Sequence, residues 1–135
     1  MTYARAYQHT SEQTFSPKIL TQIIIDTPAG DSQGFFNSAK LGFVIPNGYA
    51  GMYVVMVTGY WDGHPSGGTL RQVEIRSGNF TIGGDTKPAV AGTAVWMSAF
   101  CSAVFNVGDV ITAHAIQASG GNLKFRNAAI LIYSL

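Results

Sequence analysis

Short runs of β-branched and aromatic residues that alternate with polar residues fill this sequence, and most end at Gly, Pro, Asn or Asp. Side chains alternate between the two faces of a strand, so a period of two indicates β-structure. The predicted strands are 2–8, 18–27, 39–45, 51–61, 69–77, 79–84, 94–105, 110–118 and 123–135, with a loop at 28–34. A chain of 135 residues is the usual size of one domain. We predict an all-β sandwich or barrel of about 8–10 antiparallel strands, in a single domain over residues 1–135.

Two predicted strands, 51–61 and 94–105, are apolar on both faces. In the first, Tyr53, Val55, Val57 and Trp61 share one face, and Met52, Val54, Met56 and Tyr60 share the other. A half-solvated strand has one polar face, so we expect these strands to lie between a core and a neighbouring subunit. Only 11% of residues are charged, against about 25% in typical soluble domains. Both features predict an oligomer.

The turn at residues 106–109, Asn-Val-Gly-Asp, predicts a hairpin between the long segments 94–105 and 110–118. In that turn Gly108 is expected to supply a positive φ, which a β-branched residue resists. Asp109 is expected to accept backbone hydrogen bonds. Both are therefore fold residues.

Two longer stretches carry motifs of a known family. FVIPNGYAGMYVVMVTGYW combines an apolar strand and a Pro-containing turn with Gly51, Tyr53 and Val55, and VFNVGDVITAHAIQASG contains the Gly108-Asp109 hairpin. In this order they resemble the jelly roll shared by the globular head of the complement recognition subunit and by tumour necrosis factor. The opening ARAY is similar to the first strand of bacterial and phage members.

The resemblance covers nearly the whole chain and departs from the family at residues 125–128, where Phe-Arg-Asn-Ala replaces an aromatic-x-Gly pattern. It implies a jelly-roll β-sandwich that forms a homotrimer. Gly51, Gly108 and Asp109 are the predicted fold-defining turn residues. The predicted trimer interface consists of Tyr53, Val55, Phe100 and Tyr133. A tyrosine suits such a contact because its ring is apolar and its hydroxyl is polar.

The sequence offers little for catalysis. Each histidine stands alone in a different segment, so no paired imidazoles are available for a metal; these are His9, His64 and His114. Cys101 is the only cysteine and is predicted to be a small buried apolar residue. Aspartates occur one to a loop, which is a weak pattern for calcium. We expect no catalytic residue, no metal, no cofactor and no enzymatic activity.

One stretch predicts a ligand site. Tyr60, Trp61, Asp62 and His64 combine two aromatics with a polar turn. Aromatic rings stack on the apolar faces of sugars while Asp and His bind hydroxyls, which predicts a carbohydrate contact. In the competing interpretation, Trp61 only fills the end of the sandwich.

The formal net charge is +1 with scattered Lys and Arg, which predicts neither nucleic-acid binding nor membrane attachment. No signal-peptide or transmembrane pattern is visible, so no secretory route is expected. The hypothesis is a bacteriophage virion protein assembled in the host cytoplasm, either a capsid decoration protein or a tail-fibre receptor-binding head. Its partners would be its own copies, other virion proteins, and a host receptor or glycan. The alternative is a soluble lectin-like or cytokine-like module made by a cell.

Overall fold

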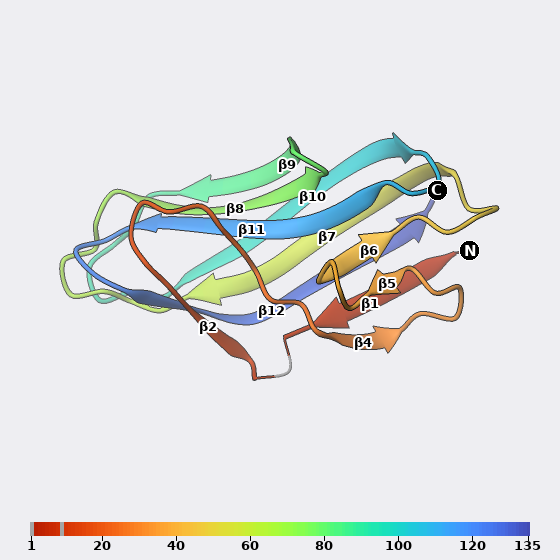
Figure 1. Cartoon of the computed structure of the whole chain (residues 1–135). Coiled ribbons are helices and arrows are strands. Elements are labelled where there is room, and N and C mark those ends of the chain that lie inside the picture. The colour runs from red at the N-terminus through yellow and green to blue at the C-terminus, as the bar shows by residue number, and fades with distance from the viewer. Residues whose placement is uncertain (1, 9) are drawn as a thin grey trace.

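The computed structural model describes residues 2–8 and 10–135, and every regular element in them is a β-strand (Figure 1). The strands are β1 (Tyr3–Tyr7), β2 (Glu12–Phe15), β3 (Thr21–Gln22), β4 (Thr27–Gly30), β5 (Phe36–Asn37), β6 (Gly42–Val44), β7 (Gly51–Trp61), β8 (Leu70–Ser77), β9 (Phe80–Lys87), β10 (Val95–Phe105), β11 (Val110–Ala118) and β12 (Leu123–Ser134). The first sheet has the order β10-β7-β12-β1-β4, with β2 paired to β12. The second has the order β5-β6-β11-β8-β9, with β3 paired to β11. All pairs are antiparallel, and the two sheets form the predicted sandwich.

A single apolar cluster fills the space between the sheets. It follows from the strand alternation, because every second residue of β7 from Tyr53 to Trp61 is buried. Trp61 packs edge-on against Phe15 and Phe125, with ring centroids 5.2 and 5.0 Å apart. Cys101 is a free, buried thiol in this core, as predicted. Burial raises the pKa of this thiol above its usual value.

The hairpin predicted between 94–105 and 110–118 is wrong. Strand β10 pairs along its whole length with β7 in the first sheet, whereas β11 pairs with β8 in the second. The turn at 106–109 therefore carries the chain from one sheet to the other. Its residue types specify a reversal of direction, but they do not decide whether the two segments remain hydrogen-bonded neighbours.

The long strand predicted at 18–27 is also wrong. Only Thr21–Gln22 forms a strand with β11, although the amides of Lys18 and Ile23 also donate to carbonyls of β11. The backbone amide of Ile24 donates to Oε1 of Gln13 at 2.7 Å instead of to a neighbouring strand. Strand β4 begins at Thr27 and occupies the first part of the predicted loop 28–34. The apolar alternation here is real, because Ile23 and Ile25 are buried, but an alternating segment needs a free partner edge to become a long strand.

The departure from the family pattern at residues 125–128 forms a β-bulge in β12. The register with β7 shifts between Arg126 and Ala129, and Asn127 adopts a φ of +54°. Asparagine tolerates this left-handed conformation better than most residues, so Asn127 replaces the glycine that the family pattern would supply. Arg126 and Ala129 consequently lie on the same, outer side of the sheet.

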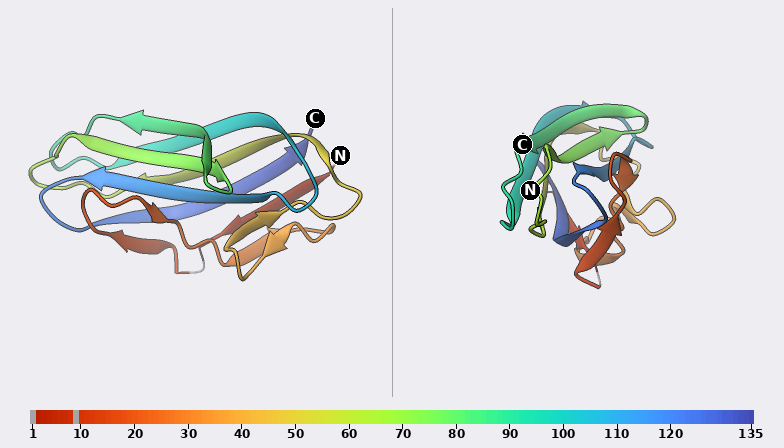
Figure 2. Two further views of the ribbon diagram at one scale, coloured as in Figure 1. Left: turned by 45° about the horizontal axis from the view of Figure 1, so that its top comes forward. Right: turned by 90° about the vertical axis from the view of Figure 1, so that its left-hand side faces the viewer.

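The sandwich has two different ends (Figures 1 and 2). The N- and C-termini lie together at one end, and the connections after β7, β9 and β11 lie at the other, which we call the loop end. Buried Gln117 stabilises the loop end: its amide donates to the carbonyl oxygens of Phe15 and Gly121, both at 3.0 Å, and accepts from Ser119. These bonds hold the last connection against β2.

The turn at 106–109 has the predicted chemistry. Gly108 adopts a φ of +88°, and Oδ2 of Asp109 accepts a hydrogen bond from the amide of Asn106 at 2.8 Å. Gly108 also donates its amide to the carbonyl of Ile45 at 2.9 Å. Gly51 is different, because it is the first residue of β7 and does not have a positive φ.

Replacing Gly108 by alanine is expected to lower the free energy of unfolding by about 1–2 kcal/mol, the cost of a left-handed conformation. No atom lies within 4 Å of the added Cβ, so the effect is purely conformational. Gly51→Ala is the matched control, since its Cβ would meet only Tyr53 at 3.9 Å. Urea unfolding at one protomer concentration measures both variants, and equal losses would contradict this account of Gly108.

Candidate functional site

The outer side of the first sheet is apolar over most of β10, β7, β12 and β1. Phe100, Val104 and Met52 are 69%, 66% and 51% exposed. The strand register places these side chains in rows, because Phe100 lies opposite Met56 and Met56 lies opposite Leu131. We call this surface the apolar face; its residues are Tyr3, Met52, Val54, Met56, Phe100, Val104, Leu131 and Tyr133.

The next row towards the loop end has small side chains. Ser98 and Ala129 both lie opposite Thr58, and this part of the surface is hollowed. The hollow measures about 200 Å³ and is lined by Arg5, Met56, Thr58, Ala129, Ile130 and Leu131. Two of its lining residues, Met56 and Leu131, belong to the apolar face.

The four predicted interface residues fall into two groups. Phe100 and Tyr133 lie on the apolar face, whereas Tyr53 and Val55 are 3% and 0% exposed inside the protomer. Tyr53 donates its hydroxyl to the carbonyl of Tyr49 and packs against Phe35, so the prediction that it and Val55 contact another subunit is wrong. Both faces of β7 are apolar, and alternation alone could not say which one points inward.

The four predicted ligand residues are also separated. Trp61 is fully buried, so the competing interpretation, in which it fills the end of the sandwich, is correct. Tyr60 points to the outer side, where its ring centroid lies 4.4 Å from that of Trp96. Trp96 is 64% exposed and was missed by sequence reasoning, because only the β7–β10 register brings it beside Tyr60.

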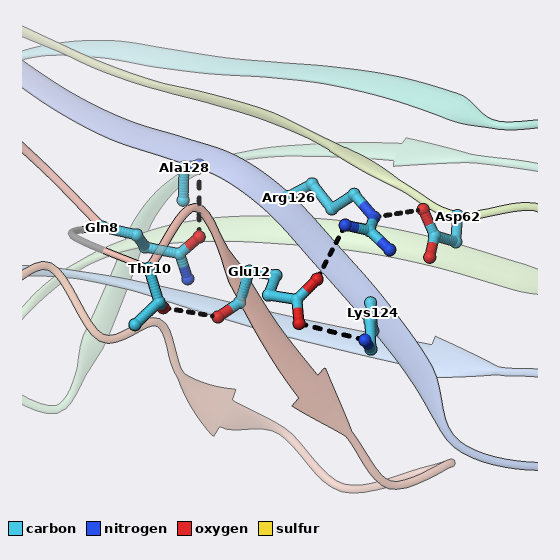
Figure 3. Close-up of polar contacts among 7 residues, drawn as sticks. All are labelled: Gln8, Thr10, Glu12, Asp62, Lys124, Arg126 and Ala128. Carbon is cyan, nitrogen blue, oxygen red and sulfur yellow. Dashed lines mark hydrogen bonds and ion pairs between the residues drawn. The ribbon is translucent and has the colours of Figure 1, made fainter.

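Asp62 belongs to a network of ion pairs at the loop end (Figure 3). Arg126 donates from Nε to Oδ1 of Asp62 and from Nη1 to Oε2 of Glu12, both at 2.7 Å. Lys124 donates to Oε1 of Glu12 at 3.0 Å. Lys124 and Arg126 hold the pKa of Glu12 below its usual value, and Asp62 raises that of Arg126. These ion pairs hold the four side chains in position.

His64 lies apart from this network. Its Nδ1 is 2.8 Å from the hydroxyl of Ser66 and also accepts the backbone amide of Ser66 at 3.2 Å. An Nδ1 atom that accepts the backbone amide two residues further along closes a local turn. It is therefore poorly placed to take a proton from a nucleophile. His114 lies on β11, where burial lowers its pKa. His9 lies outside the described residues.

The carboxylates considered for calcium are engaged elsewhere. Asp31 accepts the amides of Phe35 and Phe36, both at 2.7 Å, and Asp85 accepts the amide of Ser98 at 2.9 Å. Within residues 2–8 and 10–135, no three His, Cys, Asp or Glu side chains gather as a metal site would require. The same residues contain no helix with the length and apolar character needed to cross a bilayer.

Known structures share this architecture. The chain is similar to the globular domain of zebrafish complement 1qA protein, with a TM-score of 0.69 and 11% identity over 100% of this chain and 98% of that one. It is similar to the PRD1 vertex protein P5, with a TM-score of 0.65 and 16% identity over 100% and 74%. It is also similar to Eiger TNF from S. frugiperda, with a TM-score of 0.61 and 13% identity over 99% and 92%.

These likenesses define the class of fold: the chain is a jelly-roll sandwich of the kind found in complement globular heads and tumour necrosis factor-like proteins. The fold implied by the sequence motifs is therefore confirmed. No protein-family model and no curated protein sequence matches the chain.

Proposed function

We propose that this protein is a non-enzymatic, homotrimeric attachment module whose subunits meet through the apolar face. The observation that carries the proposal is the exposure of Phe100, Val104 and Met52 on a single protomer. An exposed patch of this kind marks an interaction surface, and aromatic residues and methionine are enriched in subunit contacts.

The shape of the face is compatible with a ring of subunits. Phe100 and Val104 project from β10, the edge strand of the sheet, while the hollow beside Ala129 lies over β7, β12 and β1. If the projecting part of one copy enters the hollow of the next, the contact is head to tail, and such contacts form a closed ring when the rotation between copies closes. The complement-head and tumour necrosis factor-like resemblance supports three subunits.

Within this class we propose a bacteriophage virion component, either a capsid decoration protein or a tail-fibre receptor-binding head. The likeness to the phage vertex protein P5 supports it. A soluble lectin-like or cytokine-like module made by a cell is the second candidate, and the likeness to Eiger TNF and to murine APRIL supports that candidate.

Sedimentation equilibrium tests the assembly. A trimer has three times the 14.4 kDa mass of one chain at micromolar concentration, and a monomer mass would contradict the proposal. Electron microscopy of purified particles from the producing cells then separates the two candidates. A virion protein is expected in threefold-symmetric positions on the particles, whereas its absence from particles would leave the cell-made module.

A further inference from the structure

The last row of the outer side, at the loop end, differs from the apolar face. Trp96 lies opposite Tyr60, Tyr60 opposite Arg126, and Arg126 opposite Glu12, so these residues form one line across β10, β7, β12 and β2. We call this line the aromatic–charged row. Its aromatic half comes from β10 and β7, and its charged half comes from β12 and β2.

The aromatic half has an open ring on an anchored strand. Trp96 is 64% exposed although Tyr60 leans against it at an interplanar angle of 41°. The backbone beneath the ring is tied to β9, because Lys87 donates to the carbonyl of Trp96 at 2.7 Å and Asp85 accepts the amide of Ser98. A large exposed ring on a rigid strand provides a stacking platform.

The charged half is ordered but accessible (Figure 3). Side chains of Glu12, Asp62, Lys124 and Arg126 are 32–42% exposed while bonded to one another. Among the described residues, their mutual bonds use Nε and Nη1 of Arg126 and Oδ1 of Asp62, which leaves Nη2 and Oδ2 for a ligand. Donors and acceptors are thus held in position beside the aromatic pair.

The charges of this half cancel. Lys124 and Arg126 are balanced by Glu12 and Asp62, and Lys87 lies 3.5 Å from Asp85. A site that selected phosphate or a carboxylated ligand would carry an excess of positive charge. The row therefore suits a neutral ligand that has one apolar face and an edge of hydroxyl groups, which is the chemistry of a pyranose sugar.

We propose that the aromatic–charged row binds a neutral glycan, with one pyranose stacked on Trp96 and hydroxyls of a neighbouring sugar unit paired with Arg126 and Asp62. This assignment deepens the attachment function proposed above and rests on it. It differs from the site predicted at Tyr60–His64, because Trp61 and His64 take no part. The row of Ser98, Thr58 and Ala129 lies between the aromatic–charged row and the apolar face.

Saturation-transfer NMR on the full chain tests the assignment with lactose, maltotriose and chitotriose as neutral probes. Lactose compared with 3′-sialyllactose measures the effect of one added carboxylate. We expect transfer to the ring protons of at least one neutral probe and no gain for sialyllactose. Trp96→Ala should reduce the transfer at least fivefold, and Arg126→Gln should also weaken it. Phe80→Ala, an exposed aromatic at the opposite end of β9, should leave it unchanged.

Sedimentation equilibrium on the same samples measures their oligomeric state. A trimer that gives no transfer with any neutral probe would overturn the glycan site and leave the assembly intact. A monomer that binds sugar would overturn the assembly and leave the site. Unchanged transfer in Trp96→Ala, stronger transfer to sialyllactose, or dissociation of Trp96→Ala would each overturn the assignment, the last because Trp96 would then belong to the subunit contact.

Discussion

Phe100→Asp is expected to convert the proposed trimer into folded monomers. In the protomer this side chain is 69% exposed, so a carboxylate there is hydrated and costs the fold little. In the proposed trimer the same position would lie within a dry contact among Met56, Leu131 and their copies. Burying an unpaired carboxylate costs several kcal/mol, on the order of a thousandfold or more in the association constant.

Sedimentation velocity at about 20 μM protomer and circular dichroism measure the two parts of this prediction. Phe80→Asp is the matched control, since Phe80 is 76% exposed and lies outside the apolar face. We expect a monomer with an unchanged β-sheet spectrum for Phe100→Asp, and a trimer for Phe80→Asp. A trimeric Phe100→Asp, or dissociation of both variants, would contradict the placement of the contact on the apolar face.

Of the substitutions considered for stability, Trp61→Ala is expected to cause the largest loss, about 3–5 kcal/mol in the free energy of unfolding. Trp61 is fully buried between Phe15 and Phe125. Gly59 shows how closely this cluster is packed, because a Cβ at that position would lie 2.5 Å from the ring of Phe125. The neighbouring side chains therefore cannot collapse easily into the space that the indole leaves.

Trp96→Ala provides the comparison, because it makes the same chemical change on the outer side of the adjacent strand. Its loss of stability should stay within about 1 kcal/mol. Urea unfolding at one fixed protomer concentration avoids the dependence of an oligomer's stability on concentration. Equal losses of unfolding free energy in the two variants, or a larger loss for Trp96→Ala, would contradict the conclusion that Trp61 is the tryptophan that stabilises the core.

Much of the fold could be predicted from local pattern. The segment 51–61 is β7 with the predicted bounds, and the segments 94–105 and 123–135 match β10 and β12 to within one residue. These strands are long, near-continuous apolar runs of eleven or twelve residues that are rich in β-branched and aromatic side chains, so the signal is strong. The turn chemistry of Gly108 and Asp109 was equally readable, because φ and short-range hydrogen bonds depend on residues close in sequence.

The residues of the candidate sites were harder to predict from the sequence. Trp61 and Trp96 are both tryptophans in apolar strands, yet one fills the core and the other is exposed. Arg126 reaches Glu12 although 114 positions separate them, and Tyr60 reaches Trp96 through the register of two strands. Nothing near these residues in the sequence specifies such partners.

The sequence by itself determined that the chain forms strands, where most of the long ones begin and end, and that two of them have two apolar faces. Only the tertiary structure decided that Tyr53 and Val55 face the core while Met56 and Phe100 face outward. It also decided that β10 joins β7 and not β11. The physical reason is that a period of two distinguishes the two faces of a strand from each other, whereas the side that is buried and the strand that lies alongside depend on packing between distant segments.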